Sequence, residues 1–176
     1  MLEVLKELVP TIRRVVIIYN PIQAPQVGMW HAIEEAARSI SVQASAVNAV
    51  GADNLKRIIE NFAREPGGGV IVLPNPITTA NRKLIIELAA RHRVPAAYLY
   101  SYYVQEGGLV SYGSDPIVQY RQSASYVDRI LKGTKPADLP VQLATDFKLA
   151  INLKTAKALG ITIPQALLST AGEVVE

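Results

Sequence analysis

Runs of apolar residues alternate with helix-like segments along the first half of the chain. Residues 15–19 form a β-branched run that is apolar on both faces, which is typical of a strand buried between two layers of helices. The apolar positions between Leu2 and Val9 recur at helical spacing until Pro10, and this predicts a short amphipathic helix. The same alternation predicts further helices at 26–39, 52–64 and 79–91, and further strands at 42–47, 69–73 and 96–100.

This regular alternation predicts the fold class. A strand followed by a helix and a second parallel strand forms a right-handed crossover, and several such units in a row build one sheet with helices on both faces. We therefore expect an α/β protein whose parallel sheet is flanked by helices.

The pattern changes after Tyr100. A Gly107-Gly108 step and a second short strand near 109–113 stand where another long helix is expected, and we interpret this segment as a crossing between lobes. A helix at 116–131, a linker at 133–140 and an alternating strand at 147–153 follow. The helix carries apolar residues near helical spacing: Ile117, Tyr120, Ala124, Val127, Ile130 and Leu131. We expect this stripe either to fold back on the helices of its own lobe or to pack against a second copy of the chain, and we favour the homodimer.

Composition narrows the class of partner. Hydrophobic residues make up 49% of the 176 residues and charged residues 19%, as in a globular protein with a substantial core. The net charge of +3 is spread along the chain without a basic run, so nucleic acid is not an expected partner. Cysteine is absent, which excludes a disulfide framework and a thiolate metal site.

Several enzyme and cofactor classes lack their motifs in this sequence. The segment 15–25 contains no Asp or Glu to hold magnesium, as a phosphorylated receiver domain requires, and no Gly-x-Ser-x-Gly elbow is present. His31 and His92 have no carboxylate at metal-ligand spacing, and the glycines at 67–69 precede a strand instead of following one. We therefore expect a protein that is not an enzyme and that holds neither a cofactor nor a metal.

Four loops at the ends of the predicted strands are the candidate ligand site. Ligands of open α/β sheets bind outside the carboxyl ends of the strands, which nominates 20–26, 48–51, 74–79 and 100–103. These loops carry amide, hydroxyl and phenol groups that suit a small polar or zwitterionic molecule. For Pro74-Asn75-Pro76 a rigid turn is an equally good interpretation. The tyrosines near Tyr100 fit either a core or a cleft, and we favour the cleft for Tyr100 and Tyr102 because they lie where the strand ends.

The second half of the chain carries a specific family resemblance. The stretches "EGGLVSYGSD" and "YVDRILKGTKPADLPVQLATDFKLAINLKTAKALGITIP" closely resemble the end of a family of type I periplasmic binding proteins of ABC transporters. The stretches "LKELVPTIRRVVIIYNP" and "IELAARHRVPAAYLY" are similar to the second lobe of the same family. Relatives bind aromatic or branched amino acids and other small solutes.

The resemblance implies two α/β lobes with a ligand clamped between them. It assigns 1–108 to the second lobe and 109–176 to a crossover and C-terminal segment that completes the first lobe, whose amino-terminal half is not in this sequence. Many relatives are expected to have Asp where this chain has Asn75. The ligand-binding residues that the resemblance implies are Asn20, Pro21, Asn75, Thr78, Thr79, Tyr100, Ser101 and Tyr102.

The function that the resemblance implies is solute binding for an ABC import system, with a small molecule such as an amino acid or carboxylate as ligand and an ABC permease as partner. The whole protein is then expected in the periplasm or anchored by lipid outside the cytoplasm. Residues 1–8 lack the basic start and long apolar centre of an export signal. This is the one direct support for an alternative that we rank below import, a cytosolic regulatory domain of the same fold that senses a small molecule.

Overall fold

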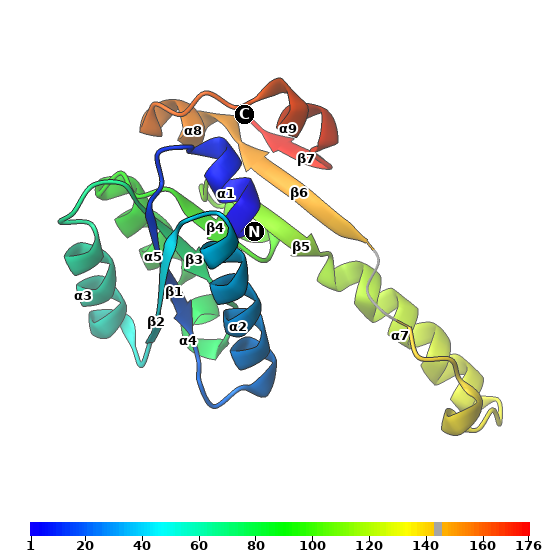
Figure 1. The fold of residues 1–176 in the computed structure, drawn as a ribbon. Helices are drawn as coiled ribbons and strands as arrows, with labels where there is room; N and C mark the ends of the chain where they lie inside the picture. Colours follow the sequence, from blue (N-terminus) through cyan, green and yellow to red (C-terminus); the bar gives the residue numbers. More distant parts are fainter. Residues whose placement is uncertain (143–145) are drawn as a thin grey trace.

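A computed structural model describes residues 1–142 and 146–176. Within these residues a single seven-stranded sheet has the order β2-β1-β3-β4-β5-β6-β7 (Figure 1). Its strands are β1 (Arg14–Tyr19), β2 (Gln43–Asn48), β3 (Gly68–Val72), β4 (Ala96–Tyr98), β5 (Val110–Ser114), β6 (Phe147–Asn152) and β7 (Glu173–Val175). All neighbours pair in parallel except β5 and β6, which are antiparallel. The predicted α/β class with a largely parallel sheet is confirmed.

Helices cover both faces of this sheet. They are α1 (Leu2–Leu8), α2 (Ala24–Ser39), α3 (Ala52–Phe62), α4 (Pro76–Ala80), α5 (Arg82–Arg91), α6 (Ser101–Gln105), α7 (Pro116–Leu131), α8 (Leu153–Leu159) and α9 (Gln165–Thr170). Val15 and Ile17 of β1 belong to a core cluster with α1, α2, α8 and α9, whereas Val16 and Ile18 belong to a second cluster with α3 and α5. The apolar run of β1 is therefore buried on both faces, as its sequence predicts.

The sheet continues past residue 108, where the sequence led us to place a lobe boundary. Strand β6 pairs with β5 from Phe147–Ser114 to Ile151–Val110, and β7 pairs with β6. Ala156 of α8 and Leu167 of α9 lie in the same core cluster as α1. The tail has too few apolar residues for a core of its own, so it extends the core of the first hundred residues. Of the residues that the structure describes, 116–142 leave this body.

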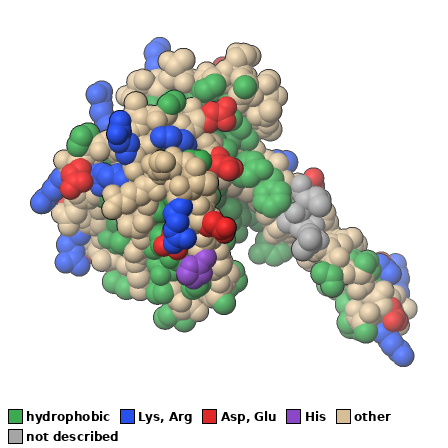
Figure 2. Space-filling model, viewed as in Figure 1, with side chains coloured by type: hydrophobic (Ala, Val, Ile, Leu, Met, Phe, Trp, Pro, Cys, Tyr) green, Lys and Arg blue, Asp and Glu red, His purple; other side chains and the backbone are tan. Residues whose placement is uncertain are grey.

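Those residues form an arm that projects from the sheet (Figure 1). It consists of α7 and a returning segment with a 3-10 turn, η1 (Pro136–Asp138), and the Tyr126 hydroxyl joins the two by donating a hydrogen bond of 2.5 Å to the Pro140 carbonyl. No residue of α7 is buried, and Tyr120 is 76% exposed. Hydrophobic side chains lie on the arm surface in Figure 2. The expectation that the stripe folds back on its own lobe is therefore wrong.

Candidate ligand-binding wall

Three exit loops meet at one edge of the sheet because β1, β3 and β4 are adjacent and parallel. The Leu73 N–H donates to the Ile18 carbonyl at 2.9 Å, so β1 and β3 stay paired up to the point where both chains leave the sheet. Asn20 follows β1, Asn75 follows β3 and Tyr100 follows β4. We call these three exit loops and the starts of the helices that follow them the wall.

Asn75 and Thr78 have a defined structural role in the wall. The Asn75 Oδ1 accepts hydrogen bonds from the N–H groups of Ile77 and Thr78 at 2.9 and 3.0 Å, and the Thr78 hydroxyl accepts one from the Asn75 N–H at 2.9 Å. This is a capping box at the start of α4, and Pro76 at the first helical position reinforces it. Both side chains are buried, and the Asn75 Nδ2 has no hydrogen-bond partner. The rigid-turn interpretation of Pro74-Asn75-Pro76 is confirmed.

Gln26 lies behind the wall and was not among the residues predicted from sequence. It is 4% exposed, and its side-chain amide contacts the backbone of both the β1 loop and the β3 loop. A glutamine in the first turn of a helix has no sequence signature for such contacts, because both loops are brought to it only by the fold.

Tyrosine side chains form a continuous stack from the core to the surface of the wall. Ring centroids are 4.7 Å apart between Tyr98 and Tyr103, 4.9 Å between Tyr103 and Tyr102, and 5.5 Å between Tyr102 and Tyr100. Tyr98 and Tyr103 are buried, whereas Tyr100 and Tyr102 are half-buried. The core interpretation therefore holds for Tyr98 and Tyr103, and the outer pair offers an aromatic surface.

Burial controls the ionisation of these phenols. It raises the pKa of Tyr103 to about 12, and the nearby Thr79 and Thr78 hydroxyls oppose this shift. Burial also raises the pKa of Tyr98 and, together with the nearby Tyr102, that of Tyr100. The hydroxyls of Tyr98 and Tyr103 have no partner with hydrogen-bond geometry. All three phenols are therefore neutral at physiological pH.

The remaining predicted residues are more exposed. Pro21 is exposed, and Asn20, Thr79 and Ser101 are half-buried. Arg82, on the helix after α4, lies with its guanidinium carbon 6.0 Å from the Tyr102 ring centroid and pairs with Glu106 at 2.8 Å. The hydrogen bond that Arg82 donates to the Glu106 carboxylate is the main cause that raises the pKa of Arg82. The positive charge of Arg82 is thus already paired with the Glu106 carboxylate beside the two outer tyrosines.

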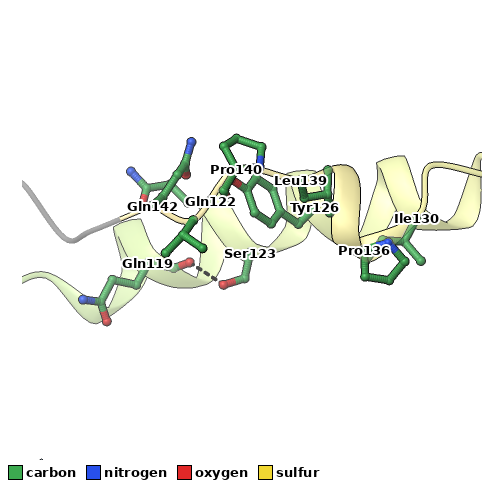
Figure 3. A pocket seen from close by; sticks show the side chains of 10 residues that line it. Gln119, Gln122, Ser123, Tyr126, Ile130, Pro136, Leu139, Pro140 and Gln142 are labelled. Atoms are coloured by element: carbon green, nitrogen blue, oxygen red, sulfur yellow. Dashed lines mark hydrogen bonds between the residues drawn. The ribbon is translucent and has the colours of Figure 1, made fainter.

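Three cavities lie away from the wall. One of about 540 Å³ separates α7 from the returning segment of the arm (Figure 3). One of about 480 Å³ lies between α6, α8 and the end of β7, and one of about 420 Å³ between α8 and α9. The described residues include no cluster of three or more His, Cys, Asp or Glu side chains suited to a metal ion. None of the described helices is both long and apolar enough to span a bilayer.

Comparison with known proteins gives the class. Residues 1–175 match the family model described as ABC transporter substrate binding protein. The chain therefore belongs to this family of substrate-binding proteins, as the resemblance of its sequence implies. No curated protein matches it.

Three solved structures have the same fold. A conserved domain protein from Vibrio cholerae shares 27% identity with a TM-score of 0.88, and a Streptococcus pneumoniae ABC domain in complex with L-Trp shares 22% with a TM-score of 0.89. A ligand-free, open substrate-binding protein with adhesive properties from Clostridium difficile shares 19% with a TM-score of 0.72. These matches cover 98%, 98% and 99% of this chain but 58% of each solved chain. The chain thus spans less than two thirds of the length of these neighbours.

Proposed function

We propose that this chain supplies one wall of the solute cleft of an ABC import system. The observation that carries the proposal is the meeting of the β1, β3 and β4 exit loops at one edge of the sheet in a chain of the substrate-binding family. Ligands of open α/β sheets bind at this position. A wall without a facing surface is open to water, so the cleft closes only when a second lobe covers it.

The proposed ligand is an amino acid or a similar small polar or carboxylate solute. The half-buried rings of Tyr100 and Tyr102 offer a flat apolar surface, while Asn20, Thr79 and Ser101 offer polar groups beside it. The L-Trp complex of the Streptococcus pneumoniae neighbour supports this class of ligand. Of the eight residues that the resemblance implies, we assign direct contact to these five and to Pro21, and loop support to the buried Asn75 and Thr78.

The second lobe and the transport partners also belong to the proposal. We place residues 116–142 against that lobe, since they leave the body as an arm. The closed, loaded protein would then present the solute to a permease outside the cytoplasm, in the periplasm or at a lipid anchor. The extra length of the solved neighbours is enough to hold a second lobe.

The direct test is a nuclear magnetic resonance titration of the chain with a panel of amino acids and small carboxylates, including L-tryptophan. We expect shifts of the Asn20, Thr79 and Ser101 amides at roughly millimolar solute, because the facing half of the contacts is missing. Tyr102→Ala should weaken binding about fivefold, whereas Tyr126→Ala on the arm should leave it unchanged. If no solute moves these amides, or if shifts gather at the 480 Å³ cavity instead, the proposal is wrong.

A further inference from the structure

Gln26 is a buried amide in the first turn of α2, at the third helical position after Gln23. A buried side-chain amide that lacks hydrogen bonds destabilises a fold, so its partners explain its position. Gln26 has three of them. Its Oε1 accepts from the Asn20 N–H at 2.7 Å, and its Nε2 donates to the Pro74 carbonyl at 2.9 Å and to the Gln23 side-chain oxygen.

These bonds connect two parts of the wall that are distant in the sequence. The Asn20 N–H belongs to the loop after β1, and the Pro74 carbonyl immediately precedes Asn75 in the loop after β3. One planar amide thus fixes the separation and the relative orientation of the two loops. Neither bond can be replaced by water without opening the buried space that Gln26 fills.

We propose that Gln26 is a positioning residue for ligand binding: it holds the β1 and β3 exit loops in one arrangement before the solute arrives. This inference rests on the proposed function of the wall. A preformed wall avoids the free-energy cost of ordering two loops when the solute binds. Loss of the Gln26 amide therefore lowers affinity even though Gln26 is too buried to contact the solute.

Asn152 provides a matched control. It is also a buried amide, 5% exposed, and it also joins two segments, because its Nδ2 donates to the Val104 carbonyl at 3.0 Å and its Oδ1 accepts from the Thr155 N–H at 2.8 Å. It is the last residue of β6, which is antiparallel to β5, so it lies at the opposite end of the strands from the wall. Its partner Val104 lies in α6 after the wall residues Ser101 and Tyr102. Removing either amide should lower the unfolding free energy by a similar amount, but only the loss of the Gln26 amide should lower the affinity for the solute.

The experiment compares the chain with its Gln26→Ala and Asn152→Ala variants by chemical denaturation and by nuclear magnetic resonance titration with L-tryptophan, or with whichever panel solute binds the wild type. We expect both variants to lose stability, and only Gln26→Ala to lose about fivefold or more in affinity. Gln26→Glu keeps the acceptor for Asn20 but replaces the donor to Pro74 with an oxygen. It should therefore protect the Asn20 amide from hydrogen exchange while still weakening binding.

The outcomes separate the inference from the proposed function. Equal affinity of the wild type and Gln26→Ala overturns the positioning role and leaves the solute cleft intact. Equal loss of affinity in Gln26→Ala and Asn152→Ala also overturns it, since the effect then follows general stability. A wild-type chain that binds no solute in the panel contradicts the proposed function itself, and the positioning role falls with it.

Discussion

Amide side chains at the wall are largely occupied by the protein's own backbone. The Asn20 Oδ1 accepts from the Ile22 N–H at 3.0 Å, the Asn75 Oδ1 caps α4, and both ends of the Gln26 amide are bonded. Asparagine is favoured at such turns and caps because its short side chain reaches nearby N–H groups. The family resemblance implied Asp in many relatives where this chain has Asn75. Because Asn75 caps α4, this difference affects the helix cap directly.

The capping role predicts how Asn75 responds to substitution. Asn75→Ala removes the acceptor for two helical N–H groups and should cost about 1 kcal/mol of unfolding free energy. Asn75→Asp keeps that acceptor and removes the buried Nδ2 that has no partner, so its stability at neutral pH should stay close to wild type. Urea denaturation of the three proteins measures this. Equal loss in both variants would show that the cap does not stabilise α4.

The buried tyrosines predict a loss of stability in alkali. Burial raises the pKa of Tyr103 from its usual value near 10 to about 12, so between these values the unfolded state releases a proton that the folded state retains. The contribution of this phenol is therefore complete below pH 10 and is lost as the pH rises toward 12.

Removing the hydroxyl should remove this pH dependence. Tyr103→Phe keeps the ring stack and deletes a buried hydroxyl that has no partner, so we expect it to be at least as stable as wild type at pH 7 and to unfold less readily in alkali. The measurement is thermal unfolding at a series of pH values, with the exposed Tyr120→Phe as control. A steeper alkaline loss in Tyr103→Phe than in wild type would contradict the expectation.

At the scale of elements, the local sequence pattern predicted most of the strands and helices. It failed where contacts between distant residues determine the structure. The strand at 15–19 and the alternating helices follow from periodicity alone. Instead of the helix expected at 79–91 there are two: the capping box starts α4 at Pro76, and Asn81 separates α4 from α5. A Cβ on Gly108 would lie 2.6 Å from the Tyr98 ring, so the Gly107-Gly108 step packs closely on the body. Its interpretation as a crossing between lobes stays a prediction.

The candidate site likewise has a part that the sequence predicted and a part that it could not predict. The rule that ligands bind at the carboxyl ends of parallel strands predicted that the loops at Asn20, Asn75 and Tyr100 share one edge, and the strand order bears out that placement. It could not predict Gln26, whose partners are backbone groups brought near by the fold. Nor could spacing separate the buried Tyr98 from the half-buried Tyr100.

Close packing of β5 on β4 predicts a sensitive glycine. A Cβ on Gly113 would clash with the Leu99 carbonyl oxygen, so Gly113→Ala should force the strands apart and cost about 1–3 kcal/mol. Gly28 lies in α2 with open space around its Cα, so Gly28→Ala should instead stabilise by about 0.5–1 kcal/mol. Thermal unfolding of both variants tests the pair. A tolerated Gly113→Ala would mean that β5 can shift freely.

At the scale of the whole molecule, the arm carries apolar side chains that no described part of the body covers. Ile117, Tyr120 and Val127 are 61%, 76% and 53% exposed, and with Ala124 and Leu131 they recur every three or four residues along one side of α7. A neighbouring side of the helix, which includes Tyr126 and the stripe residue Ile130, faces the returning segment (Figure 3). Fully burying one such large side chain contributes about 1.5–3 kcal/mol, so a stripe left in water favours association.

We therefore expect these 176 residues on their own to form a symmetric homodimer through α7. The helix is about 24 Å long and projects from the body, so its stripe is accessible to a second copy related by a twofold axis. Light scattering after size exclusion should report a dimer for the wild type and a monomer for Val127→Glu, because the introduced carboxylate would lie in the buried centre of the stripe. Ser125→Glu, an exposed position on the same helix, should remain dimeric. A wild-type monomer at high micromolar concentration would exclude the dimer and leave the stripe to the second lobe.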